Sequence, residues 1–166
     1  MCRRVKIDHK IKKDFGFTLV ELIVVMAILG LLATVGLASF RSSQIKGRDA
    51  QRKHNLGQLQ RGLEAYYNDK GRYPPTLPSG EWRDEDVEGG TLYMKEVPTD
   101  PTAYKYNYET NNNGTYYKIF AYLENQKDKD LVPEDCSVVR SEPCDGVTCN
   151  YGVSSANLDV CKEITE

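Results

Sequence analysis

The sequence predicts an α+β protein: a long N-terminal helix, membrane-spanning in its first half, packs on a small antiparallel sheet and precedes a disulfide-rich C-terminal tail. Three observations support this class. Residues 17–40 are almost wholly apolar, the following residues keep a helical period, and two Tyr-rich segments flank Asn113-Gly114. The predicted division is a leader at 1–16, a transmembrane half-helix at 17–40, an amphipathic half-helix at 41–69 and a globular region at 70–166.

Charge is distributed unevenly along the 166 residues. The net charge is −2, but residues 1–16 hold six basic and two acidic side chains, whereas residues 17–166 hold 16 basic and 22 acidic ones. A basic segment before an apolar run and an acidic body after it is typical of an exported protein with a cytoplasmic N-terminus. A dedicated nucleic-acid-binding protein usually has a basic excess, so no nucleic acid is expected among the partners.

The apolar run from Phe17 to Phe40 is long enough to cross a bilayer. Its 24 residues contain one charge, Glu21, and would form roughly 36 Å of helix against a bilayer core of about 30 Å. Its 15 large apolar residues favour insertion by about 7 kcal/mol, whereas one acid costs at most about 3 kcal/mol. Insertion tolerates Glu21 without needing it. The alternatives are a functional side chain and a Glu that leans back to the interface.

The junction before the apolar run fits a processing motif. The stretch "KKDFGFTLVE" places Gly16 directly before Phe17, with Glu21 four residues further on. It resembles the type IV pilin family, which combines a basic leader, Gly, Phe and a Thr-Leu-hydrophobic-Glu start to a long membrane helix. The resemblance implies a pilin-like fold, cleavage after Gly16 by a prepilin peptidase and N-methylation of Phe17. It also implies that Glu21 pairs with the Phe17 amine of a neighbouring subunit during assembly.

Two later segments extend the resemblance to the major pseudopilins of type II secretion. "LEAYYNDKGRYPPTL" matches the segment in which their chain leaves the long helix, and "YMKEVPTDP" matches the segment that precedes their first strand. The matching residues are Tyr66, Tyr67, Asp69, Gly71, Tyr73 and Pro74 in the first motif and Pro98, Asp100 and Pro101 in the second.

The function implied by the resemblance is a structural subunit of a type IV pilus-like or type II secretion pseudopilus filament. Its partners would be copies of itself, related pilins, the prepilin peptidase and the membrane assembly machinery. It would sit in the inner membrane as a single-pass protein, N-terminus in the cytoplasm, and then join an extracytoplasmic filament. The alternatives are a membrane-tethered binding module that does not polymerise and an ordinary secretory signal cut after Ala38.

The rest of the chain suggests one helix face and a hairpin. An apolar stripe along the second half-helix predicts a buried face, and the charged residues between, among them Arg48, Asp49 and Arg52, are expected on a solvated face. Gly71 should end the helix, and residues 71–90 should be irregular. Strands are predicted at Tyr104–Glu109 and Thr115–Leu123. The stripe consists of Leu56, Leu59, Leu63, Tyr66 and Tyr67.

Four of the five cysteines lie in the tail, and Cys2 lies in the leader. An even number in an exported segment predicts two disulfides with three possible connectivities, among which pairing of nearest neighbours is a guess. Nearest neighbours would give Cys136–Cys144 and Cys149–Cys161.

A cofactor is not required by any motif in the sequence. Glu124, Asp128 and Asp130 could hold calcium, as the major pseudopilins do at about this place, but two interrupting lysines favour a solvated loop. No phosphate loop, nucleophile elbow or metal-binding His pair is present, so the chain is not expected to be an enzyme.

Overall fold

The computed structural model describes residues 16–84 and 89–162, except for the side chains of 35–38. The leader lies outside this range but for Gly16. The chain divides into two compact units, one ending at Arg41 and one beginning at Ser42, and helix α1 (Leu19–Lys70) contributes to both. The helix ends at Lys70, as predicted, because Gly71 adopts a φ of 69° and its N–H closes the last turn on the Tyr67 carbonyl at 2.7 Å.

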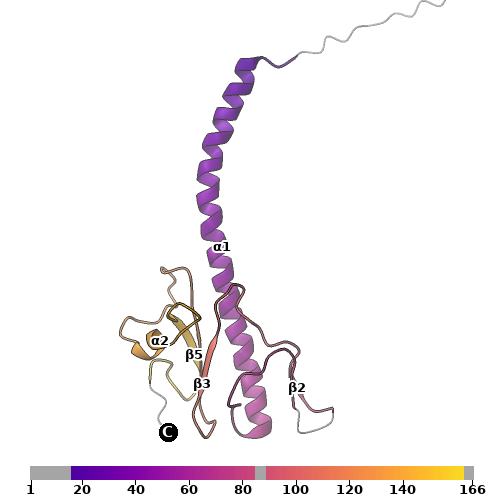
Figure 1. Cartoon of the computed structure of the whole chain (residues 1–166), viewed down its shortest axis with the longest axis vertical. Coiled ribbons are helices and arrows are strands. Elements are labelled where there is room, and N and C mark those ends of the chain that lie inside the picture. Colours follow the sequence, from indigo (N-terminus) through magenta and orange to yellow (C-terminus); the bar gives the residue numbers. More distant parts are fainter. Residues whose placement is uncertain (1–15, 85–88, 163–166) are drawn as a thin grey trace, which may run out of the picture. The chain divides into compact units, whose positions relative to one another are not determined.

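A three-stranded antiparallel sheet covers the apolar stripe of α1 in the second unit. It consists of β3 (Asn107–Thr110), β4 (Tyr117–Ala121) and β5 (Tyr151–Ser154), with β4 in the centre. Figure 1 shows β3 and β5 on one side of the last turns of α1 and β2 on the other. The predicted hairpin of β3 and β4 is confirmed with shorter strands, whereas β5 was not predicted.

The hairpin loop depends on Asn111 and Gly114. The Asn111 carboxamide accepts the Thr115 N–H at 2.7 Å, and Gly114 takes a φ of 63°. The Gly114 carbonyl accepts the N–H of Tyr73 at 2.7 Å, and an added Cβ would lie 2.8 Å from the Tyr73 carbonyl oxygen. The loop therefore needs glycine both for its backbone angle and for its contact with the turn after α1.

Residues 71–90 are not wholly irregular, contrary to the prediction. Strand β1 (Trp82–Arg83) lies in this segment and pairs with β2 (Leu92–Met94), just beyond it, to form a second, two-stranded sheet. Trp82 is 4% exposed and its ring packs against that of Tyr66, with 5.4 Å between the ring centroids, so β1 contributes a buried aromatic to the core on α1. Strands of two and three residues are too short to show the alternation of apolar and polar residues by which a strand is predicted.

The two faces of β4 bury two different cores. Tyr117, Ile119 and Ala121 pack with the predicted stripe of α1, where Leu56, Leu59 and Leu63 are fully buried. Phe120 points to the opposite face, where it joins residues of the tail around α2 (Ser137–Ser141). The tail is thus a second layer of the domain, composed of Val132, Cys136, Val139, Cys144 and Cys149.

Two disulfides form in the tail, as predicted, but the guessed pairing is wrong. Cys144 bonds to Cys149 because the chain reverses between them, with Asp145 and Gly146 at positive φ. Cys136 bonds to Cys161 instead of to Cys144. Cys149 lies five residues from Cys144 in sequence and Cys136 lies eight residues from it, so the shortest spacing pointed to the observed pair.

The two disulfides should stabilise the domain unequally. They close loops with separations of 25 and 5 residues, for which loop-closure entropy gives about 3.5 and about 2 kcal/mol. Replacing Cys136 and Cys161 together by Ala should therefore lower the free energy of unfolding more than replacing Cys144 and Cys149. Denaturant unfolding followed by Trp82 fluorescence measures both, and equal losses would contradict the assignment, as would a mapped peptide linking Cys136 to Cys144.

Candidate functional site

The start of α1 is organised by a reciprocal pair of hydrogen bonds. Glu21 Oε2 accepts the backbone N–H of Thr18 at 3.1 Å and its hydroxyl at 3.0 Å, while the Thr18 hydroxyl accepts the Glu21 N–H at 3.2 Å. This is a capping box, in which Thr18 is the N-cap and Glu21 stands three residues into the helix. The carboxylate also lies at the positive end of the helix dipole. Glu21 therefore has a local partner within an otherwise apolar segment.

The predicted processing residues lie just outside the helix. Gly16 and Phe17 precede α1, and the Phe17 side chain is 91% exposed. Cleavage, methylation and assembly at these residues remain predictions.

The first unit exposes a continuous apolar surface. Within the described residues, every large apolar side chain that is exposed lies between Phe17 and Phe40, apart from Leu92. In the same part of the chain, α1 is the one helix long and apolar enough to cross a membrane. A surface of this kind needs lipid or other apolar helices around it.

The second unit has a buried polar centre, which corrects the prediction of a solvated face. Asp49 and Arg52 are 1% and 0% exposed. They continue the stripe of Leu56, Leu59 and Leu63 at helical spacing, so they point toward the same side of α1. The helical spacing of Asp49 and Arg52 indicated burial on the face of the stripe, but their charge favoured a prediction of solvent exposure.

Arg52 uses all five of its N–H groups. Its Nε and Nη2 donate to the two carboxylate oxygens of Asp100 at 2.7 and 3.2 Å, and Nη1 donates to Asp49 at 2.7 Å and to Glu124 at 2.8 Å. The remaining N–H of Nη2 reaches the Thr102 hydroxyl at 3.0 Å. Because every N–H group of this buried guanidinium has a partner, Arg52 fixes the positions of Asp49, Asp100, Thr102 and Glu124 relative to one another.

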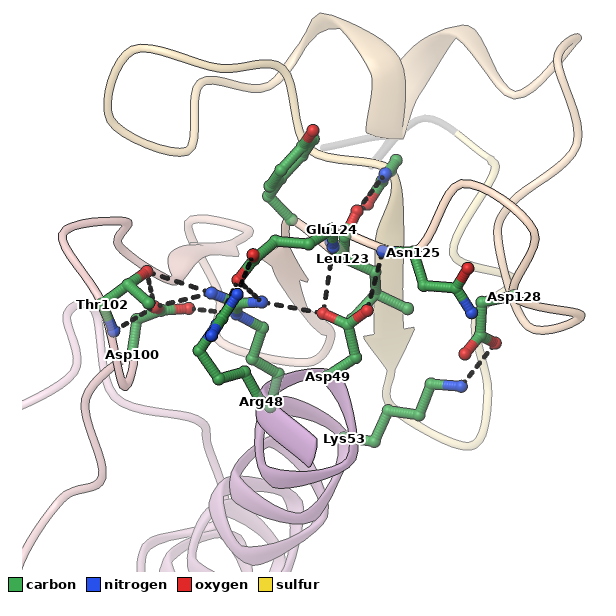
Figure 2. Close-up of polar contacts among 12 residues, drawn as sticks. Arg48, Asp49, Lys53, Asp100, Thr102, Leu123, Glu124, Asn125 and Asp128 are labelled. Atoms are coloured by element: carbon green, nitrogen blue, oxygen red, sulfur yellow. Dashed lines mark hydrogen bonds and ion pairs between the residues drawn. The ribbon is translucent and has the colours of Figure 1, made fainter. Parts of the chain in front are cut away.

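Asp49 connects the helix to the end of the central strand. Its two carboxylate oxygens accept the backbone N–H groups of Glu124 at 2.9 Å and Asn125 at 2.8 Å (Figure 2). Arg48 adds a second cation, which donates through Nε to Glu124 at 2.8 Å. The chain leaving β4 is thus held against α1 by side-chain and backbone contacts together.

Asp100 organises the turn at the second motif. It accepts the Thr102 N–H at 2.8 Å and the Thr102 hydroxyl at 2.7 Å, in addition to the fork of Arg52. Asp100 thus fixes the backbone at residues 100–102 and is also one of the anions around Arg52.

The ion pairs change the acidity of these carboxyl groups. Hydrogen bonds from Arg48, then Arg52, lower the pKa of Glu124 to about 2, although burial acts in the opposite direction. Burial tends to raise the pKa of Asp100, but hydrogen bonds from Arg52 and Thr102 outweigh it and the pKa is lowered. Both groups stay ionised in mildly acidic solution.

The residues considered for calcium are not together in the structure. Glu124 faces the arginines, whereas Asp128 and Asp130 face Lys53 at 2.6 and 2.7 Å. In the described part of the chain, no three His, Cys, Asp or Glu side chains are grouped to hold a metal ion.

Comparisons with known proteins find relatives of the N-terminal segment and of longer parts of the chain. Residues 11–37 match the family model of the prokaryotic N-terminal methylation motif. A type II secretion system core protein G from Vibrio cholerae is 31% identical over 108 residues, covering 60% of this chain and 73% of that protein. Core protein G from Klebsiella pneumoniae is 32% identical over 100 residues, covering 54% and 70%.

A shorter part of the chain is similar to a type IV pilin. The type IV major pilin PilA of Myxococcus xanthus is 36% identical over 61 residues, which are 37% of this chain and 28% of that pilin. No solved structure matches the chain significantly.

Removing Arg52 should destabilise the second unit strongly. In Arg52→Ala, Asp49 and Asp100 stay buried without their countercharge, which typically costs about 3–5 kcal/mol. Arg61→Ala, on the exposed side of the same helix, is the matched control and should change the free energy of unfolding by less than about 0.5 kcal/mol. The measurement is denaturant unfolding of both variants. Similar losses of unfolding free energy in the two would show that the buried ion pairs of Arg52 are not important for stability.

Glu124 should make the stability sensitive to acid. Its pKa falls from an ordinary value of 4.5 to about 2 on folding, so its contribution is complete above about pH 4.5 and is lost as the pH falls toward 2. Glu124→Gln should lower the melting temperature at pH 7 and make it fall less steeply between pH 5 and pH 2.5. The exposed Glu134→Gln should follow wild type, and an unchanged slope in Glu124→Gln would contradict the assignment.

Proposed function

The chain belongs to the family of type IV pilins and type II secretion pseudopilins, and from this we propose that it is cleaved after Gly16 and assembles through its N-terminal helix as a structural subunit of a helical filament. The observation that supports this most is the conjunction, at one helix start, of the methylation motif, the exposed Phe17 and the acid Glu21 within an apolar surface. The proposed role is structural rather than catalytic.

Before assembly, the apolar surface of residues 17–40 would lie in the inner membrane, with the basic leader in the cytoplasm. The asymmetry of charge around the apolar run supports this orientation. A prepilin peptidase would then remove the leader and methylate the new Phe17 amine. In the filament, other copies or related pilins would replace lipid around the same side chains.

Glu21 would gain a second partner on assembly. In the single chain its carboxylate is satisfied by Thr18, which explains how an acid is tolerated in the membrane segment. In the filament, the carboxylate would also meet the Phe17 amine of a neighbouring subunit. A charge pair in an apolar surrounding fixes the register of packed helices more than it adds stability.

A type II secretion pseudopilus is the more strongly supported of the two filament types. The matches to core protein G of Vibrio cholerae and Klebsiella pneumoniae extend over 108 and 100 residues, whereas the match to PilA covers 61. Matches that cover more than half of this chain must include part of the globular region at residues 70–166. Filaments visible by electron microscopy that contain this chain would support the proposal over a tethered module that does not polymerise.

Two substitutions at Glu21 separate the helix cap from the charge. Glu21→Gln keeps acceptor and donor groups for the capping box but has no charge, and Glu21→Leu loses both. Both should insert in the membrane and yield a mature chain that begins with N-methylated Phe17, as measured by intact mass. Both should assemble poorly, since an unpaired buried amine costs roughly 3–5 kcal/mol, or about two to four powers of ten in the assembly constant.

The assay compares membrane fractions with sheared filaments from the same cells. Normal filament yield from Glu21→Gln would contradict the charge pair and leave the cap as the function of Glu21. A mature chain that begins at Ser39 would contradict the proposed processing.

A further inference from the structure

The loop after β4 raises the question of which cation balances its carboxylates. Residues 124–130 contain Glu124, Asp128 and Asp130 together with two lysines, which leaves a net charge of −1. The resemblance to pseudopilins implies calcium at about this place. Calcium takes six to eight oxygen ligands, commonly including several carboxylates, at about 2.3–2.6 Å.

The arrangement of the described residues does not fit such an ion. Glu124 is turned away from the other two acids, because Arg48 and Arg52 engage both of its oxygens. Figure 2 shows Arg48 reaching Glu124 on one side of Asp49 and Lys53 reaching Asp128 on the other. Only two carboxylates therefore remain at the loop, too few to dominate the ligand set of a calcium ion.

The Lys53 ammonium occupies the position between these two carboxylates. Nζ donates to Asp128 Oδ1 at 2.6 Å and to Asp130 Oδ2 at 2.7 Å, and it lies 5.7 Å from the centre of the Tyr151 ring. Two carboxylates and one aromatic face are suitable partners for the three N–H groups of an ammonium. The Lys53 side chain is 24% exposed and that of Asp128 17%, so water screens the pair only in part.

Backbone contacts of the loop depend on the same aspartate. Asp128 Oδ1 also accepts the Asp130 N–H at 2.9 Å, and the Asp128 N–H donates to the Asn125 carbonyl at 3.0 Å. Asn125 is itself bound to Asp49 on α1. The hydrogen bond from Lys53 is the first cause of a lowered pKa of Asp128, which keeps this carboxylate charged for its partners.

We propose that the ammonium group of Lys53 does in this chain what a divalent cation would otherwise do in the acidic loop, so that the domain folds and holds residues 124–130 without calcium. The cation is covalently attached to α1. Its local concentration does not change with the medium, so the loop is insensitive to chelators. This inference does not depend on whether the chain polymerises.

The test uses the full chain in detergent micelles, with two readouts. Thermal unfolding is followed by the fluorescence of Trp82, the one tryptophan of the sequence. The loop itself is probed with a calcium-independent protease that cuts after lysine, since Lys127 and Lys129 are exposed within it. Each variant is measured in 5 mM CaCl₂ and in 1 mM EGTA.

Wild type should give the same melting temperature and the same rate of loop cleavage in both media. Lys53→Met keeps the apolar stem but removes the charge, and should lower the melting temperature by about 3–6 °C and speed cleavage about fivefold. Lys46→Met, exposed on the same helix, is the control and should behave as wild type.

Either of two results would overturn the proposal. A wild-type chain that melts higher, or is cut more slowly, in calcium than in EGTA has a calcium site that the lysine does not replace. A Lys53→Met variant indistinguishable from Lys46→Met would show that the ammonium does not hold the loop.

Discussion

The buried guanidinium of Arg52 is the contact on which the globular unit most depends. It joins three segments that are distant in sequence: α1, the turn at Asp100 and the chain leaving β4 at Glu124. An isolated buried cation would be prohibitively costly, so its five donors and their acceptors must be placed together or not at all. The apolar stripe beside it stabilises the domain, but apolar contacts tolerate sliding. The charge cluster allows one register of α1 against the sheet, which a repeating filament subunit requires.

Several charged side chains of helix α1 have partners within the same chain, in both units. Near its start, Glu21 is held by Thr18 before any neighbour is present. Further along, Asp49, Arg52 and Lys53 each bind groups of the globular unit. Over residues 16–41, the part of the first unit that the structure describes, the exposed surface is mostly apolar and contains one carboxylate, that of Glu21. Such a surface can exchange lipid for other helices while the folded unit stays unchanged, and this combination suits a protein stored in a membrane and used in a filament.

The sequence was sufficient for features that rest on local patterns. The helix start, the stop at Gly71, the Leu56–Leu59–Leu63 stripe and the hairpin around Gly114 all have period or turn signals within a few residues. The burial of Arg52 was missed because its acceptors Asp100 and Glu124 lie 48 and 72 residues away. The pairing of Cys136 with Cys161 and the strand β5 were missed for the same reason, since both depend on how the tail folds back over Phe120.

We infer that Asp100 stays buried and charged because Arg52 is present. A double-mutant cycle of Arg52→Ala and Asp100→Ala, read as free energies of unfolding of the full chain, tests it most directly. In the wild-type background Asp100→Ala should be strongly destabilising. In the Arg52→Ala background the same substitution removes an unpaired buried carboxylate, so it should cost nothing or restore stability, with a coupling energy of about 1–3 kcal/mol. Equal losses in both backgrounds would show that the two side chains act independently, and Asp100 would then not depend on Arg52.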